Sequence, residues 1–445
     1  MDVSLARSSA LRKVALRITT YLSVIYVISV IDRSNVGIAA LQMVQDIHLS
    51  PAMFGLGAGM FFVGYTLFEV PSNLALHKFG ARVWLARIMI TWGIIASAIG
   101  LVTGAHSYYI LRFILGAAEA GYFPGILFFL TLWYPAKDRA KPYVYFTSCA
   151  VLAYVFLGPL SAWLMTVSEG WMGYHGWRWL FLLEGGPCVL LGIVTLLYLQ
   201  DSPAKAKWLT REEKDYLIGT LEAERRAAPP VEHRSLGSFL GDGRLWLMIF
   251  AYLFWGIGNL GFVFWLPQLL KAMSSAYSIQ HIGYMSALPY ICALVGMHFM
   301  TWIASRTGRR GGVLIWSCLL SFASLSIGAW NHSIAVQYTM LCICGFFQFT
   351  TLSVFWQLPA EYLGGVSAAV GIAAISSMVG IGGLLGPWLV GIIRQVTGKF
   401  PWAIEMLAAC FLIQTIFIIG MRVKRKMPGE PEVVWAKDEE QSAEV

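Results

Sequence analysis

The sequence predicts an all-α membrane protein with twelve transmembrane helices in two six-helix bundles. Of its 445 residues, 58% are hydrophobic and only 13% are charged. This composition is too apolar for the surface of an ordinary soluble protein. Twelve apolar runs are long enough to cross a bilayer, which takes about 20 residues in a helix. A polar, charged stretch separates the first six runs from the last six.

The predicted helices and domains follow in chain order. The first six spans are 18–40, 52–76, 83–103, 107–133, 143–166 and 179–200, and the last six are 245–270, 281–304, 312–330, 333–358, 367–393 and 402–421. We therefore expect an N-terminal bundle over 1–200, a cytoplasmic linker over 201–242, a C-terminal bundle over 243–422 and a cytoplasmic tail over 423–445. The basic first 17 residues lead directly into a full-length span, so the first helix is expected to target the chain without cleavage.

The basic residues predict the orientation. Most of the 32 lysines and arginines lie in the N-terminal arm, the even-numbered loops, the linker and the tail. The positive-inside rule then places both termini in the cytoplasm, for a multi-pass protein of a bacterial-type inner membrane. The net charge of +8 is thus a topology signal. Nucleic-acid binding is not expected, because the basic residues are spread over separate loops.

The two halves of the chain carry the same landmarks at a constant offset. Gly80 and Gly308, in the loops after the second and eighth helices, are 228 residues apart, and so are the Gly-Pro pairs at 158–159 and 386–387. Two unrelated landmarks with one offset indicate a duplication. Such parallel repeats are typical of transporters whose halves rock around a central site.

Charged side chains interrupt two of the predicted helices. Asp32 and Arg33 lie in the first, and Arg112 and Glu119 lie in the fourth. Such a residue near the bilayer centre costs at least about 2.5–3.5 kcal/mol and usually faces a watery cavity with a functional role. Arg112 and Glu119 are two helical turns apart, so we expect each to meet Asp32 or Arg33 on a neighbouring helix. The 228-residue offset maps positions 32, 112 and 119 onto apolar residues: Leu260, Met340 and Phe347. Proton and anion chemistry is therefore predicted in the N-terminal half.

Four further motifs carry a family resemblance. They are residues 32–37, 112–125, 177–185 and 204–210, and the Gly-x-Arg/Lys loops after the second and eighth helices accompany them. The loops resemble the signature loop of the major facilitator superfamily. The four motifs resemble its anion:cation symporter family, especially the tartrate, phthalate and hydroxyphenylacetate branch. The resemblance extends from about Arg12 to Arg422.

The resemblance implies proton-coupled uptake of a small organic carboxylate by alternating access, in a chain that works as a monomer. It implies that Asp32 and Glu119 carry protons, that Arg33 and Arg112 bind the anion, and that Tyr65 lines the substrate cavity. Three positions depart from the family pattern and favour a less hydroxylated or an aromatic acid over a sugar acid. They are Val30, Ala150 and Ser376.

The C-terminal half is predicted to shape the non-carboxylate end of the substrate. Trp265, Trp356 and Ser376 are the predicted contacts, although aromatic residues are abundant here and packing is an alternative for each. Gating residues are predicted at the cytoplasmic loops: Glu69, Lys78, Arg82, Arg306, Arg309 and Arg310. Glu184 and Glu405 are interpreted as residues near helix starts, where the helix dipole stabilises a carboxylate.

Three other functions compete with symport. An organic-anion exchanger of the same fold is the nearest alternative. A channel would not need two duplicated bundles, and a membrane enzyme would need a nucleophile or metal constellation that the sequence does not display. We expect no cofactor and no metal. The partners expected are the anion, protons and the lipid bilayer, and the seven cysteines are interpreted as buried apolar residues.

Overall fold

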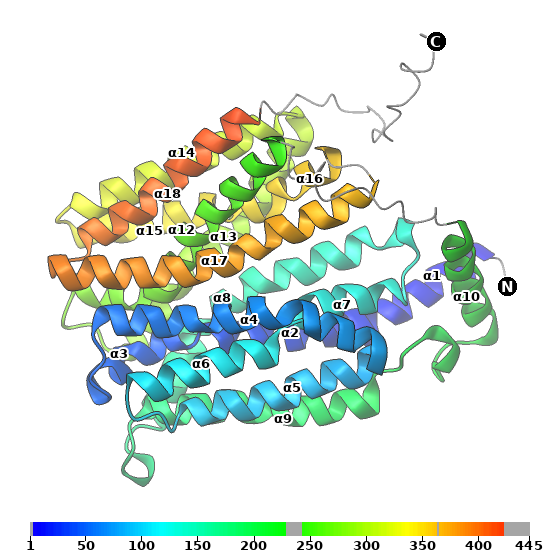
Figure 1. The fold of residues 1–445 in the computed structure, drawn as a ribbon, viewed down its shortest axis with the longest axis horizontal. Helices are drawn as coiled ribbons and strands as arrows, with labels where there is room; N and C mark the ends of the chain where they lie inside the picture. The colour runs from blue at the N-terminus through cyan, green and yellow to red at the C-terminus, as the bar shows by residue number, and fades with distance from the viewer. Residues whose placement is uncertain (1–2, 228–242, 363–364, 422–445) are drawn as a thin grey trace.

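The computed structural model describes residues 3–227, 243–362 and 365–421, and these ranges are built from helices joined by turns and short loops (Figure 1). Twelve helical runs are long and apolar enough to cross a membrane. The predicted all-α architecture with twelve spans is therefore confirmed.

The helices of the first half run from α1 to α10. Their bounds are α1 Val3–Val14, a π-helical turn Ala15–Thr19, α2 Thr20–Ser34, α3 Val36–Asp46, α4 Pro51–Phe79, α5 Ala81–Ile99, α6 Ala105–Glu119, α7 Tyr122–Thr131, α8 Ala140–Val167, α9 Gly176–Tyr198 and α10 Arg211–Ala227. The helices of the second half are α12 Gly243–Met273, α13 Ile279–Thr307, α14 Arg310–Trp330, α15 Ile334–Gln348, a π-helical turn Thr351–Phe355, α16 Gln357–Tyr362, α17 Gly365–Thr397 and α18 Pro401–Gly420.

The spans gather into two groups. Figure 1 shows α2–α9 along one side of the molecule and α12–α18 along the other, with α1 and α10 together at one end. The groups meet where α4 packs on α17, α8 on α13 and α3 on α12. The predicted tail over 423–445 and much of the predicted linker lie outside the described residues.

Close backbone contact joins the groups at the end of α4 that begins at Pro51. A β-carbon on Gly55 would lie 2.2 Å from the carbonyl oxygen of Pro387, and one on Gly391 would lie 2.3 Å from that of Pro51. Only glycine permits such an approach between helices. The amide of Ala52 also donates to Gln395 Oε1 across the same contact, at 3.3 Å. This end of the interface is therefore closed.

Three predicted helices are longer or less regular than their apolar runs suggested. The first run continues helically from α1 to Asp46, with a π-helical turn at Ala15–Thr19 and a break at Asn35. The fourth is divided at Gly121, whose φ of 81° is left-handed. The tenth contains the second π-helical turn, at Thr351–Phe355. Such irregularities are frequent at functional sites.

Candidate functional site

An ion pair joins Arg33 of α2 to Glu119 of α6. Ser29 Oγ also donates to Glu119 Oε1, at 3.0 Å. Each charged residue lies in the last turn of its helix, and the negative end of a helix dipole disfavours a carboxylate. Arg33 therefore compensates the charge of a glutamate that is only 1% exposed. The expected meeting of Glu119 with Arg33 is what the structure shows.

Aromatic rings flank the guanidinium of Arg33. Its Cζ lies 5.2 Å from the ring centroid of Phe61 and 5.4 Å from that of Tyr65, both on α4. These are cation–π distances. The Arg33 side chain keeps 19% of its surface exposed, although it contacts side chains of α4 and α6 in the N-terminal helix group. Arg33 is thus the charged residue of this cluster with the most free surface for a small anion.

Arg112 is buried in a different environment. It has no exposed surface, and it donates to the carbonyl oxygens of Ala58, at 3.2 Å, and Arg33, at 3.4 Å. Its guanidinium lies 5.1 Å from the ring of Phe61 and 6.0 Å from that of Phe264 on α12. In this conformation Arg112 links main-chain carbonyls of α2 and α4, and its binding of substrate stays a prediction.

A second acidic cluster lies beside the ion pair. Asn35 Nδ2, at the break between α2 and α3, donates to Glu184 Oε2 at 2.7 Å and to Asp32 Oδ1 at 3.4 Å. Ser161 Oγ donates to the other oxygen of Glu184 at 2.8 Å, and the indole of Trp92 donates to Asp32. Asp32 is 2% exposed and Glu184 7%. Two buried carboxylates thus share one amide donor.

The interpretation of Glu184 as a helix-start residue is wrong. The helix α9 begins at Gly176, so Glu184 lies in its third turn, among side chains of α2 and α8. The signal was available: an acid inside the apolar run 179–200 meets the same criterion that singled out Asp32. Glu405 does lie in the second turn of α18, where Ser326 Oγ donates to it at 2.9 Å.

The predicted C-terminal contacts lie in three environments. Trp356, next to the π-helical turn, is partly buried and donates to Tyr252 Oη at 3.0 Å. Ser376 on α17 is exposed and donates to the carbonyl of Ala373 at 3.0 Å. Trp265 has no exposed surface and donates to the carbonyl of Pro387 at 2.9 Å, at the closed end of the interface. Of the three, Trp265 serves closure in this conformation.

Comparisons with known proteins agree with this architecture. The family description "Major Facilitator Superfamily" matches residues 22–387. The chain belongs to the major facilitator superfamily. It is therefore a membrane transporter and not an enzyme, as predicted.

Relatives and a solved structure of the superfamily resemble most of the chain. A protein of Agrobacterium vitis named "Putative tartrate transporter" is 41% identical over 92% of this chain and 90% of its own length. The "Quinolone resistance transporter" of Acinetobacter baumannii is 38% identical over 94% of this chain and 96% of its own. The crystal structure of a D-xylose-proton symporter matches with a TM-score of 0.71 at 14% identity, covering 91% of this chain and 97% of that one.

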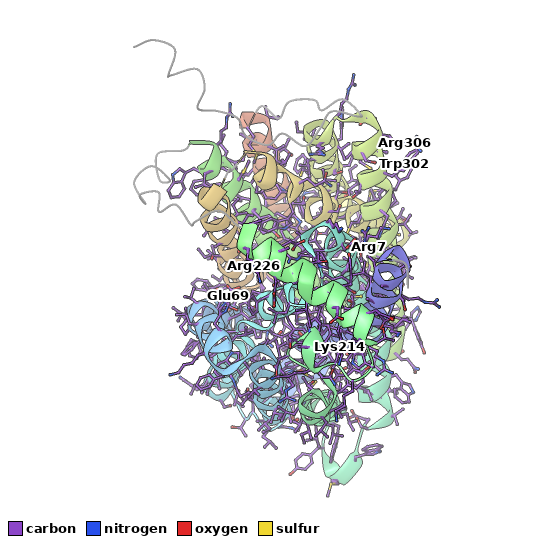
Figure 2. The ribbon with its side chains drawn as sticks, turned by 90° about the vertical axis from the view of Figure 1, so that its right-hand side faces the viewer. Arg7, Glu69, Lys214, Arg226, Trp302 and Arg306 are labelled. Carbon is purple, nitrogen blue, oxygen red and sulfur yellow. The ribbon has the colours of Figure 1, made fainter. Side chains whose placement is uncertain are left out.

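The predicted gating residues lie in both halves of the chain. Arg82 Nε is 3.8 Å from Asp201 Oδ2, Lys78 Nζ lies 5.5 Å from the ring of Phe79, and Arg306 Cζ lies 5.8 Å from that of Trp302. Figure 2, viewed onto the end that carries α1 and α10, shows Glu69 at one edge and Arg306 at a distant corner on the other group. Glu69 and Arg306 therefore do not form a joint gate in this conformation. Arg309 and Arg310 lie where α14 begins, and the role of all these residues stays a prediction.

Metal chemistry has no visible basis in the described ranges. No group of three or more histidine, cysteine, aspartate or glutamate side chains there could hold a metal ion. The seven cysteines are all free thiols, five of them buried.

Proposed function

We propose that the protein is a proton-coupled symporter that takes up a small organic carboxylate by alternating access. Tartrate is the first candidate, because it is in the name of the Agrobacterium relative, and phthalate or another aromatic acid is the next. The observation that carries the proposal is the unequal set of buried charges around α2. Three carboxylates, those of Asp32, Glu119 and Glu184, stand against the guanidinium groups of Arg33 and Arg112.

One proton would make this set neutral. Unpaired charge is costly at low dielectric, and two carboxylates that share one site do not both ionise readily. Glu119 has Arg33 as its partner, whereas Asp32 and Glu184 share only hydrogen-bond donors: Asn35, Ser161 and Trp92. We assign the first proton to Asp32 and Glu184 jointly.

Substrate binding supplies the coupling step. A substrate carboxylate that takes the Arg33 guanidinium in a two-point contact leaves Glu119 without its counter-charge. Glu119 then binds a proton, which balances one carboxylate of the substrate. A dicarboxylate such as tartrate would enter with its second carboxyl protonated as well, so that two protons accompany each dianion and the loaded site is again neutral. Neutral loading permits the two halves to reorient, since an uncompensated charge would oppose passage through the closed, dry state. Tyr65 and Phe61 flank Arg33 beside the site in this conformation.

Proton flux in proteoliposomes tests the proposal. Addition of tartrate outside vesicles that carry a pH-sensitive dye inside should acidify the lumen without an imposed gradient. Glu119→Gln should abolish proton-driven accumulation and leave substrate counterflow measurable, because the residue that takes up the coupled proton is then permanently neutral. Glu405→Gln, a glutamate of the other half that bonds to Ser326, is the matched control and should behave like wild type.

Two outcomes would contradict parts of the proposal. Counterflow without any lumenal acidification, for every acid in a panel of tartrate, phthalate, hydroxyphenylacetate and nicotinate, would establish exchange in place of symport. Normal accumulation by Glu119→Gln would remove Glu119 from the proton pathway while leaving symport in place. The quinolone-resistance relative makes drug export a second candidate. Accumulation of a quinolone inside inverted vesicles, together with no uptake of tartrate by proteoliposomes, would favour drug export.

We also propose the cellular setting. The spread of lysine and arginine over the loops supports a bacterial-type inner membrane with both termini in the cytoplasm. That orientation puts the closed Pro51–Gly391 contact on the outer side and the ends of α1 and α10 on the inner side. The conformation is then closed on the outer side.

A further inference from the structure

A cavity of about 310 Å³ lies at the end of the N-terminal group where α1 passes into α2. Arg17 of the π-helical turn, the last residues of α9, and Trp208 in the loop before α10 line it, with Trp133 beyond α7 as its wall. The cavity is separate from the Arg33 site, since no residue of the two acidic clusters lines it. The transport mechanism makes no use of it.

The lining of this cavity is cationic. Arg17 and Lys207 are both exposed, and neither has a carboxylate partner among the described residues. The nearby Asp201 is already engaged by Arg82, at 3.8 Å, and Lys205, at 3.5 Å. Arg17 Cζ lies 5.5 Å from the ring of Trp208, so the planar guanidinium of Arg17 is held at the opening of the cavity. Two free cations at one cavity favour an anion.

Unsatisfied hydrogen-bonding groups give a second, independent indication. Trp133 has no exposed surface, and its indole N–H has no hydrogen-bond partner, although its ring stacks on Trp208 at a centroid distance of 5.5 Å. Gln200 Oε1 is likewise buried without a partner. A buried donor left unpaired is costly. The cavity thus offers a neutral donor beside two cations, and an acceptor for a hydroxyl.

We propose that this cavity binds a phosphate group, most fittingly the head group of an anionic glycerophospholipid such as phosphatidylglycerol. Arg17 and Lys207 would hold the phosphate, the Trp133 N–H would donate to one of its oxygens, and Gln200 would accept from the glycerol hydroxyl. Leu197, which lines the mouth, is 82% exposed and would contact the acyl chains. The orientation proposed above places the site in the cytoplasmic leaflet, but phosphate binding does not depend on it.

Lipid retention measures the site directly. Native mass spectrometry of the full-length protein, released from phosphatidylglycerol-containing and from phosphatidylcholine-only micelles, counts bound lipids. Thermal unfolding with added phosphatidylglycerol, glycerol 1-phosphate or inorganic phosphate separates the sources, since a ligand of the folded state raises its stability. The variants are Arg17→Gln, Lys207→Gln and their combination, all at exposed positions. The control is Lys205→Gln, which removes an exposed lysine that does not line the cavity.

Wild type and Lys205→Gln should retain phosphatidylglycerol in preference to phosphatidylcholine. Each cavity substitution should weaken this retention about fivefold, the effect of one basic residue near an anionic surface. Trp133→Phe, which keeps an aromatic ring and removes the N–H, should also weaken the retention of phosphatidylglycerol. Stabilisation by inorganic phosphate equal to that by the lipid would support the phosphate site with a soluble ligand. Equal retention of both lipids by wild type, or unchanged retention in the double variant, would overturn the proposal.

Discussion

Arg33 is the residue at which ion pairing and substrate binding compete. Its planar guanidinium contacts one carboxylate, Glu119, and keeps 19% of its side chain exposed. A lysine would keep the charge but present a compact, strongly hydrated ammonium in place of the fork. A positive charge alone is therefore not sufficient at this position, and the planar guanidinium is needed.

Arg33→Lys should weaken binding of the transported anion by about 1.5–3 kcal/mol, the range for hydrogen bonds to charged groups, while the protein remains folded. Isothermal titration with the acid identified by the uptake panel gives the affinity. Arg87→Lys is the control, because Arg87 stacks on Trp84 on α5, at 3.9 Å, and belongs to neither acidic cluster. Unchanged affinity in Arg33→Lys would shift the anion site to Arg112.

At the scale of elements, the contact between α4 and α17 depends on glycine. The two helices approach so closely at Gly55 that its Cβ position lies 2.2 Å from a backbone oxygen. Backbone atoms cannot move aside as a flexible side chain can. The closed end of the interface is therefore specified by the absence of a side chain.

Gly55→Val should prevent closure at this end and reduce uptake to a few per cent of wild type, because the halves can no longer complete the cycle. Binding from the outer side should persist. Gly186→Val is the matched control, since nothing lies within 4 Å of a β-carbon at Gly186 of α9, and its uptake should be unchanged. Wild-type uptake by Gly55→Val would show that the close contact is not required for transport.

A carboxylate outside the membrane fastens α10 to α1. Burial alone would raise the pKa of Glu213, but hydrogen bonds from Lys13 Nζ, Ser9 Oγ and the backbone of Thr210 outweigh it and hold the pKa below its ordinary value. A lowered pKa in the folded state stabilises the contact above the ordinary glutamate pKa, and this contribution is lost as the pH falls through the lowered value. Figure 2 shows α10 lying across this end with α1 beside it.

Glu213→Gln should loosen α10 by about 1 kcal/mol or more at neutral pH, which hydrogen exchange of α10 amides would report as faster exchange than in wild type. The difference should shrink as the pH falls below the ordinary glutamate pKa and disappear only below the lowered pKa, where wild-type Glu213 is protonated as well. Glu212→Gln, at an exposed neighbouring position, is the control and should exchange like wild type. A difference that persisted at low pH would contradict the role of the Glu213 charge.

For the whole molecule, the distribution of basic residues predicts the orientation. Fluorescent-protein fusions at either terminus should fluoresce, and alkaline-phosphatase fusions there should be inactive, because the proposed orientation puts both termini in the cytoplasm. A phosphatase fusion in the loop between α8 and α9 should be active instead. Active phosphatase at a terminus would invert the assignment of inner and outer ends.

The whole fold was more predictable than the site. Apolar length alone located all twelve spans, because the bilayer fixes how many residues a helix needs. The expectation that Glu119 meets Asp32 or Arg33 followed from charges placed inside the first and fourth apolar runs, and the structure selects Arg33. The pairing of Asp32 with Glu184 through Asn35 was not predictable. Asp32 and Asn35 lie 152 and 149 positions before Glu184 in the sequence, and only the packing of the helices brings them together. The break at Gly121 was missed as well, since its apolar neighbours continue the hydrophobic run.

The confinement of buried charge to one half has an electrical consequence. Every charged side chain that is fully buried within the described spans belongs to the N-terminal group. A transmembrane voltage acts on charge at about 2.3 kcal/mol per elementary charge per 100 mV. A carrier whose empty form holds one shared proton presents no net charge to that field, so its return would be insensitive to voltage. The current recorded during transport would then report the charge of the cargo and its accompanying protons alone.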